Sequence, residues 1–244
     1  MSDAVTWQEV ECGSYAADLP LWEELAASAG GPILELGCGA GRVALHLAER
    51  GHDVVGIDTE AALVAALNSR AGDAGIPARA LMGDATGFDL EARFPLALAP
   101  MQLVQLLRGE SARRGMLERV AAHLAPGGIL AAALVESRHL PQPDASGDGA
   151  APLPDVRERD GWVFSSLPLA IRRDGGGLEI ERLRQAVSPG GEISEEVDIT
   201  ELEPLSPEEL AAEARRAGFR SAGTRNVLAT HWHVGSTVCL LEVP

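Results

Sequence analysis

Short apolar runs alternate with amphipathic segments between residues 31 and 136. Between the runs, apolar residues recur every three or four positions, as in Val43, Ala44, Leu47 and Ala48, and this spacing predicts helices. Such an alternation is typical of parallel strands joined by crossover helices. The pattern therefore predicts an α/β core whose strands cover residues 33–36, 53–58, 78–82, 96–99 and 129–135.

The pattern changes after Val135. Residues 137–160 are rich in Pro, Gly, Asp and Ser and show no periodicity, which predicts an exposed loop. Three alternating segments follow, separated by glycine-rich turns at 174–177 and 188–191. They predict a three-stranded antiparallel meander over residues 162–172, 178–188 and 192–202.

A helix with strong boundary signals comes next. Ser206 is a good N-cap, Pro207 suits the first helical position and Glu209 completes a capping box, so the helix is predicted to run to Gly218. Two apolar segments then predict a C-terminal hairpin that closes the sheet, over residues 219–228 and 236–243.

Composition restricts the class of protein. The 244 residues, 46% of them hydrophobic, suit one globular domain with an elaboration, and no apolar run approaches the roughly 18 residues that would suggest a membrane span. The first residues lack the basic and apolar parts of a secretory signal, so the expected compartment is the cytoplasm. Cys12, Cys38 and Cys239 have no CxxC spacing, so we expect free thiols and no metal site.

The charge of the chain argues against a nucleic-acid partner. Its formal net charge is −16 at pH 7, and no cluster of basic residues offers a local exception. Such a chain repels a phosphate backbone. Nucleic acid is therefore not an expected partner. The expected partner is a small-molecule substrate, and the chain itself is expected to be a monomer or a homodimer.

The most informative stretch is PILELGCGAGRVALHLAERGHDVVGID, which combines a buried strand, a glycine-rich turn, a helix and a second strand. Gly37, Gly39 and Gly41 let the backbone approach a ligand, and Asp58 at the end of the next strand can accept hydrogen bonds from ribose hydroxyls. The spacing is G-x-G-x-G, not the G-x-G-x-x-G of dinucleotide-binding domains. Glu35 before the turn disfavours a pyrophosphate but suits a ligand with ammonium and sulfonium charges, so the electrostatics favour S-adenosylmethionine over NAD.

The motif ELGCGAGR, together with the acid that ends the next strand, resembles motif I of class I S-adenosylmethionine-dependent methyltransferases. MGDAT at 82–86, FPLALAPMQLVQLL at 94–107 and HLAPGGILAAAL at 123–134 resemble later strands and turns of that family, so the resemblance covers nearly the whole chain. The meander is similar to that of small-molecule members such as amino-sugar N,N-dimethyltransferases and the glycine N-methyltransferase group.

The resemblance implies an α/β fold with a doubly wound, seven-stranded and mostly parallel Rossmann-like sheet. A C-terminal antiparallel hairpin completes this sheet, and the three-stranded antiparallel meander is inserted into it. The expected domains are an N-terminal helical cap at 1–30, a cofactor-binding Rossmann-like domain at 31–136 and 204–244, and a substrate-covering loop and antiparallel insertion at 137–203.

The resemblance also implies roles for individual residues. Glu35 and the three glycines would surround the methionine portion of the cofactor, Asp58 would bind the ribose, and Asp84 would bind the adenine amino group, with the Ala85 amide against the ring. Tyr15, the only tyrosine, lies in a segment that looks like the family's N-terminal helix with a Tyr near the cofactor. Further cofactor contacts are expected from Cys38, Thr59, Pro100 and Met101.

The expected reaction is methyl transfer from S-adenosyl-L-methionine to an N or O nucleophile of a small metabolite, with S-adenosyl-L-homocysteine as the product. A methyl sulfonium is already activated, so the enzyme mainly has to align the nucleophile and exclude water. A catalytic base is needed only where the nucleophile arrives protonated. His231 and His233 are the first candidates for that base, and His139 and Glu136 are the others.

Two other functions stay open. The chain could bind S-adenosylmethionine for non-methylating chemistry or without catalysis, because fold and function are separable. A nicotinamide-dependent oxidoreductase is the third hypothesis, which the glycine spacing disfavours. Neither the [DNS]PP[YFW] motif of DNA amino methylation nor the paired glutamates of arginine methylation follows the fourth predicted strand, so a small-molecule substrate is the remaining expectation.

Overall fold

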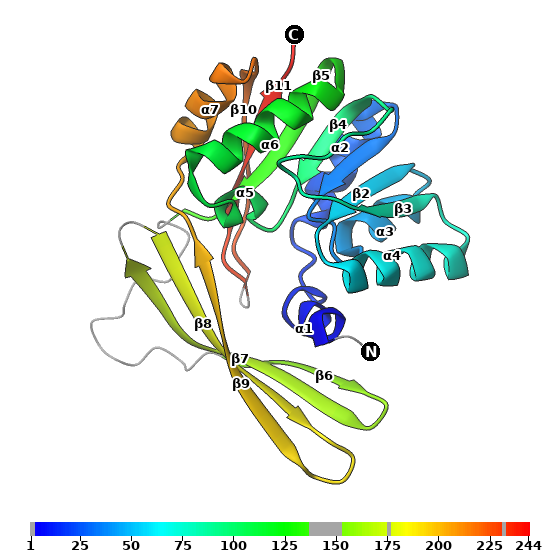
Figure 1. Cartoon of the computed structure of the whole chain (residues 1–244), viewed down its shortest axis with the longest axis vertical. Coiled ribbons are helices and arrows are strands. Elements are labelled where there is room, and N and C mark those ends of the chain that lie inside the picture. The colour runs from blue at the N-terminus through cyan, green and yellow to red at the C-terminus, as the bar shows by residue number, and fades with distance from the viewer. Residues whose placement is uncertain (1–2, 137–152, 175–176, 231–232) are drawn as a thin grey trace.

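The computed structural model describes residues 3–136, 153–174, 177–230 and 233–244. Figure 1 shows a larger sheet flanked by helices and a smaller sheet that extends from it. Helix α1 (Asp3–Cys12) lies beside the junction of the two sheets. None of the helices in the described ranges is both long enough and apolar enough to cross a membrane.

The larger sheet has seven strands in the order β10-β11-β5-β4-β1-β2-β3. β1 pairs in parallel with β2 and β4, β2 with β3, and β4 with β5, whereas β11 runs antiparallel to both β5 and β10. This confirms the predicted doubly wound, mostly parallel sheet with a C-terminal hairpin. The strands are β1 Ile33–Leu36, β2 Val54–Asp58, β3 Ala78–Met82, β4 Phe94–Ala99, β5 Leu124–Leu134, β10 Arg220–Val227 and β11 Ser236–Glu242.

Helices cover both faces of the larger sheet, and each face has its own hydrophobic core. On one face α2, α3 and α4 bury apolar side chains, with Trp22 of α2 fully buried. On the other face α5, α6 and α7 do so, with Met116 of α6 fully buried. The helices are α2 Leu19–Ala29, α3 Arg42–Ala48, α4 Ala61–Ala74, α5 Leu103–Leu106, α6 Gly109–His123 and α7 Pro207–Arg216.

The smaller sheet has four strands in the order β6-β7-β8-β9, all antiparallel. The prediction of a three-stranded meander was therefore wrong by one strand. β6 lies in the segment that we expected to be loop, and its sequence DVRER has one apolar residue, so no alternation could reveal it. Its backbone pairs with β7, which defines the strand. The strands are β6 Asp155–Arg159, β7 Trp162–Asp174, β8 Gly177–Val187 and β9 Ile193–Leu202. The rest of that predicted loop, residues 137–152, lies outside the described residues.

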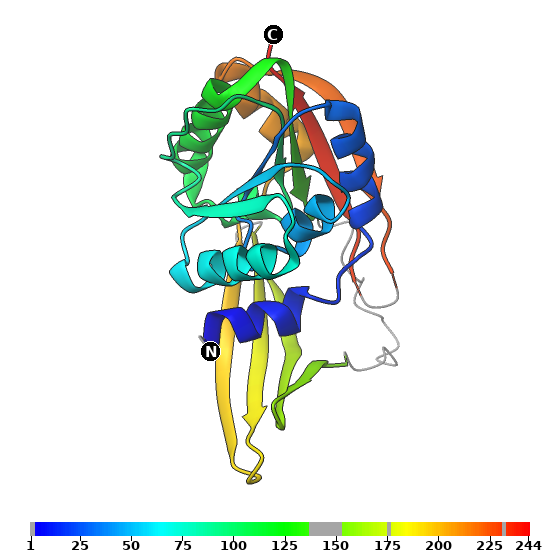
Figure 2. The ribbon, with the colours of Figure 1, turned by 90° about the vertical axis from the view of Figure 1, so that its right-hand side faces the viewer.

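Helix α1 connects the smaller sheet to the larger one. Figure 2 shows α1 crossing between α4 and the strands of the smaller sheet. Glu11 accepts two hydrogen bonds from Arg184 of β8, at 2.7 and 2.9 Å, and Glu9 pairs with Arg70 of α4 and, at 3.2 Å, with Arg157 of β6. These ion pairs hold α1 over the carboxyl ends of the parallel strands.

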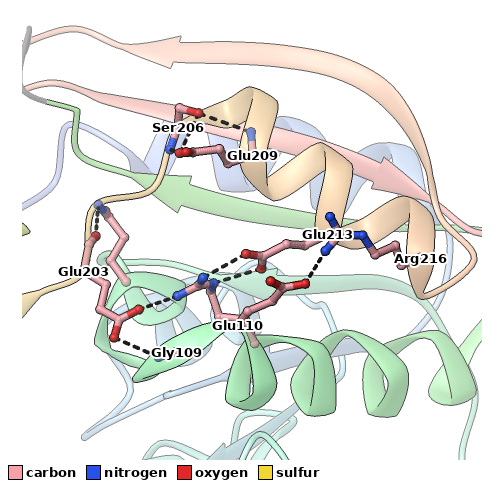
Figure 3. Close-up of polar contacts among 9 residues, drawn as sticks. Gly109, Glu110, Glu203, Ser206, Glu209, Glu213 and Arg216 are labelled. Atoms are coloured by element: carbon pink, nitrogen blue, oxygen red, sulfur yellow. Dashed lines mark hydrogen bonds and ion pairs between the residues drawn. The ribbon is translucent and has the colours of Figure 1, made fainter. Parts of the chain in front are cut away.

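An ion-pair network joins α6, α7 and the segment that follows β9 (Figure 3). Arg113 of α6 donates from Nε and Nη2 to Glu213 of α7, at 2.9 and 2.8 Å, and from Nη1 to Glu203 at 2.6 Å. Glu203 follows β9 and also accepts a hydrogen bond from the Gly109 amide at 2.8 Å. The Arg113 and Glu213 side chains are only 8% and 10% exposed, so this pair is largely shielded from water.

The predicted capping box at the start of α7 is confirmed (Figure 3). Ser206 Oγ accepts a hydrogen bond from the Glu209 amide at 3.2 Å, and Glu209 Oε2 accepts one from the Ser206 amide at 2.8 Å. Two amides that the helix leaves unpaired are thereby satisfied. The helix therefore starts where its sequence signals place it.

Candidate functional site

The glycine-rich turn between β1 and α3 has a backbone that only glycine adopts readily. Gly37 and Gly39 have φ of 62° and 53°. A Cβ on Gly37 would lie 2.9 Å from Leu103 of α5, and one on Gly39 would overlap the Gln8 side chain of α1. Gln8 Oε1 also accepts the Ala40 amide at 2.7 Å, so α1 packs directly on the turn.

Asp58 at the end of β2 supports the same turn. Its Oδ2 accepts the Gly39 amide at 2.8 Å, and its Oδ1 accepts the Glu60 amide at 3.0 Å. The carboxylate therefore lies at the mouth of the turn and does not point into the hydrophobic interior. A carboxylate oxygen has more than one lone-pair site, so Asp58 can still accept hydrogen bonds from a ligand.

Glu35 is the most unusual group in this region. It lies within β1, is 2% exposed, and its Oε2 has no hydrogen-bond partner among the described residues. Burial raises the pKa of this carboxyl to about 8. The charge of Arg42 opposes this rise of the pKa only in part, and its Nη1 and Nη2 each donate to Asp18 at 2.7 Å. A buried carboxyl oxygen without a partner is costly unless a ligand supplies a donor or a positive charge.

Asp84 follows β3 and is held in one orientation by its neighbour. Its Oδ1 accepts hydrogen bonds from the Thr86 amide and the Thr86 hydroxyl, both at 2.7 Å. These bonds hold the pKa of the carboxyl below its usual value. Asp84 is exposed, and the next residue, Ala85, is buried. The arrangement presents one ionised, oriented carboxylate at the edge of the crevice.

Two adjoining cavities run along the carboxyl ends of the strands. One has a volume of about 740 Å³ and the other about 560 Å³. Five residues line both cavities and form the wall between them: Gln8, Cys12, Gly37, Pro100 and Met101. All but one of the predicted cofactor residues line one cavity or the other. The first cavity is lined by Tyr15, Glu35, Gly37, Cys38, Gly41, Pro100 and Met101. The second cavity is lined by Gly37, Asp58, Thr59, Asp84, Ala85, Pro100 and Met101. The exception, Gly39, lies under Gln8.

The core of this site matches a known sequence family. Residues 33–128 match the sequence model of a family described as a methyltransferase domain. The matched stretch resembles a methyltransferase domain. It contains β1 to β4, the glycine-rich turn and the three carboxylates, so the resemblance expected from the sequence is confirmed for this part of the chain. No curated protein sequence matches the chain.

Solved structures extend the likeness beyond the methyltransferase domain. An amino pentose methyltransferase from Micromonospora echinaspora, solved with S-adenosylmethionine bound, is 20% identical with a TM-score of 0.70, and the match covers 98% of each chain. A sugar N-methyltransferase from a Streptoalloteichus species is 18% identical with a TM-score of 0.73, over 98% of this chain and 92% of the other. An S-adenosylmethionine-dependent methyltransferase from Clostridium acetobutylicum is 10% identical with a TM-score of 0.72, over 98% and 96%. The whole chain therefore shares the fold of these solved structures, small sheet included.

The predicted catalytic bases lie outside the methyltransferase domain. His231 and His139 are outside the described residues. His233 packs on the Tyr15 ring, with ring centroids 4.9 Å apart, and lines neither cavity itself. Glu136 accepts a hydrogen bond from Thr237 at 2.7 Å. A catalytic role for His231 or His233 stays a prediction.

Sequence reasoning missed two residues that shape the crevice. Gln8 and Arg42 both line the first cavity. Gln8 lies 32 positions before the amide that it binds, and a lone Gln in a short helix carries no signal of that contact. Arg42 does follow the glycine motif directly, and its position just after the turn could have suggested a place beside the crevice.

Proposed function

We propose that this chain transfers a methyl group from S-adenosylmethionine to an N or O nucleophile of a small molecule, and releases S-adenosylhomocysteine. One observation carries the proposal: three carboxyl groups stand in order along the crevice, on β1, at the end of β2 and just after β3. Each differs in environment, and each matches a different part of the cofactor.

The residues present fit the cofactor. Glu35 supplies the buried oxygen that lacks a donor, which suits the ammonium of the methionine part. Asp58 lies at the glycine turn, where the backbone leaves room for a ribose diol. Asp84 is oriented and ionised, ready to accept the adenine amino group. NAD would instead bring a pyrophosphate close to Glu35, and that contact is repulsive once the carboxyl ionises.

The cofactor, when bound, supplies a methyl group that is already activated for attack. The remaining work falls to this chain, and it is to align the acceptor and to exclude water. Helix α1 supports this role, because it covers the glycine turn through Gln8 and closes the crevice toward the smaller sheet. Met101 lies on the wall common to both cavities, where the acceptor would approach the methyl group.

The acceptor is proposed to bind in the part of the second cavity that the insertion lines, beside the part assigned to adenosine. Ile180 and Arg182 of β8 and Thr200 and Leu202 of β9 line this cavity opposite Asp58. This arrangement supports the proposed division into a cap at 1–30, a cofactor domain at 31–136 and 204–244, and a substrate-covering insertion at 137–203. Structural neighbours that act on sugars favour an amino sugar as the first acceptor class to test.

Further parts of the proposal concern the setting of the reaction. We place the protein in the cytoplasm, as a monomer or homodimer without a nucleic-acid partner, in keeping with its net charge of −16. Where the acceptor arrives protonated, His231 or His233 is proposed to take its proton. His233 supports this only indirectly, through its contact with Tyr15, which itself lines the first cavity.

Two measurements test the proposal. Calorimetry of the full chain with S-adenosylhomocysteine should give saturable binding of one ligand per chain, and the same titration with NAD should give none. Incubation with methyl-labelled S-adenosylmethionine and a panel of amino sugars should then yield a product heavier by one methyl group. Binding of NAD in preference would overturn the cofactor assignment, and cofactor binding without methylation of amino sugars or of a wider metabolite pool would favour a binding protein over an enzyme.

A further inference from the structure

The segment that carries Asp84 and Ala85 is anchored at its far end by α6. After Asp84 the chain makes a tight turn in which the Gly87 and Phe88 amides both donate to the Asp84 carbonyl at 3.0 Å. These bonds tie the backbone of Asp84 to that of Gly87 and Phe88. The segment then reaches Leu90, which contacts the last turn of α6.

His123, the last residue of α6, holds this end of the segment. It is 3% exposed, and its Nε2 accepts the Leu90 amide at 2.8 Å. Its Nδ1 lies 2.6 Å from the Arg119 carbonyl. An amide N–H can only donate and a carbonyl can only accept, so the two partners assign the neutral ring with its proton on Nδ1. The ring also packs on Phe88, with centroids 4.6 Å apart.

Arg119, one turn earlier in α6, holds the same segment independently. Its Nε donates to the Phe88 carbonyl at 2.6 Å, and its Nη2 pairs with Asp89 at 2.7 Å. The Arg119 side chain is 34% exposed, whereas the His123 side chain is 4% exposed. Arg119 and His123 therefore hold the segment at two points, and His123 is the more buried of the two residues.

We propose that His123 is a positioning residue for the adenosine half of the cofactor, which it does not touch. It lines neither crevice cavity, yet it fixes the segment on which Asp84 and Ala85 are presented. This inference rests on the proposed function, because it assumes that an adenosine group binds beside Asp84. The imidazole is required in its neutral form, since only then can Nε2 accept the Leu90 amide.

Protonation of His123 places two donors, Nε2–H and the Leu90 N–H, against each other. The charged groups that face the ring among the described residues are Asp89 of the segment, whose Oδ1 lies 3.4 Å from Nε2, and Arg119 of its own helix. A protonated ring would exchange its bond to Leu90 for one to Asp89. The segment would then shift, and adenosine affinity should fall.

Adenosine is the probe that isolates this effect. It lacks the ammonium group, so its affinity does not depend on the charge of Glu35. We would measure the dissociation constants of adenosine and S-adenosylhomocysteine by calorimetry at about pH 8. The variants are H123Q, which keeps an acceptor for the Leu90 amide, H123L, which keeps none, and R119M, which removes the second anchor. H52L is the matched control, at a half-buried His at the amino-terminal end of β2.

The expected result is that H123L and R119M each bind adenosine about five- to ten-fold more weakly at pH 8, and H52L as wild type does. H123Q should bind near the wild-type level, because its side-chain oxygen can replace Nε2 as the acceptor for the Leu90 amide. If H123L does not fold, R119M and H123Q still decide the question. Wild-type affinity in R119M, or a loss of about five-fold or more in H123Q, would overturn the inference. Failure of the wild type to bind S-adenosylhomocysteine would instead refute the proposed function.

Discussion

Replacing Glu35 by glutamine tests the electrostatic basis of the proposed cofactor site. In the free protein the Glu35 carboxyl is buried, its Oε2 lacks a partner among the described residues, and burial raises its pKa to about 8. At pH 7 roughly nine such carboxyls in ten are therefore protonated. An ammonium group beside Oε2 favours the ionised form. Binding of S-adenosylhomocysteine should consequently release nearly one proton from the wild type at Glu35, and none there from Glu35→Gln.

The size of the affinity change follows from the same pKa. Ionising a carboxyl of pKa about 8 at pH 7 costs about 1.4 kcal/mol. A charge-assisted hydrogen bond to the ammonium contributes about 3 kcal/mol, which leaves a net gain of about 1.5 kcal/mol. Glu35→Gln should therefore bind S-adenosylhomocysteine about ten-fold more weakly at pH 7. Above pH 8 the ionisation cost vanishes, and the difference should grow to about a hundred-fold.

Calorimetry in two buffers of different ionisation enthalpy counts the protons released on binding. Glu91→Gln is the control, because Glu91 is an exposed carboxyl that does not line the crevice. It should keep both the affinity and the proton release of the wild type. Proton release that is absent in the wild type, or equal in wild type and Glu35→Gln, would refute the assignment of Glu35 to the ammonium.

The free protein offers an independent check of the same pKa. A carboxyl whose folded pKa lies above its ordinary value of 4.5 stabilises the folded state below that value, and this contribution is lost as the pH rises through about 8. Between those limits the wild type should lose about 1.4 kcal/mol of unfolding free energy per pH unit through Glu35. Urea unfolding at several pH values should show Glu35→Gln gaining on the wild type as the pH rises. A constant difference between the two proteins would contradict the raised pKa.

Two further substitutions separate binding from stability. Asp58→Ala removes the acceptor for the Gly39 amide as well as the proposed ligand of the ribose, so S-adenosylhomocysteine binding should weaken by about 1–3 kcal/mol in calorimetry; unchanged affinity would remove Asp58 from the site. Glu213→Gln leaves the largely buried Arg113 without its bidentate partner, so the free energy of unfolding in urea should fall by about 2–4 kcal/mol while ligand affinity in the folded protein stays the same. A loss below 0.5 kcal/mol, roughly the effect of an ordinary surface change, would show that the ion pair in Figure 3 does not hold α6 to α7.

Sequence reasoning succeeded where the signal is local. The apolar runs predicted the parallel strands to within a few residues, and the capping box placed the start of α7. The glycine turn and the acids after the strands could also be read directly, because parallel strands bring their carboxyl ends to the same edge. It failed at β6. Arg157 of this strand pairs with Glu9 of α1, and the two residues are 148 positions apart in the sequence. Periodicity reports which side of an element is buried, and an edge strand of alternating charges has no such side.

By itself, the sequence determined the α/β core, the glycine-rich bend and the order of Glu35, Asp58 and Asp84 along one edge. Only the tertiary structure decided that Glu35 Oε2 lacks a partner, that Gln8 covers the bend and that His123 holds the segment after Asp84. The reason is physical. Backbone preference and hydrophobic spacing act over a few residues, whereas desolvation and hydrogen bonding depend on atoms that packing brings together from distant positions, such as the 33 that separate Leu90 from His123.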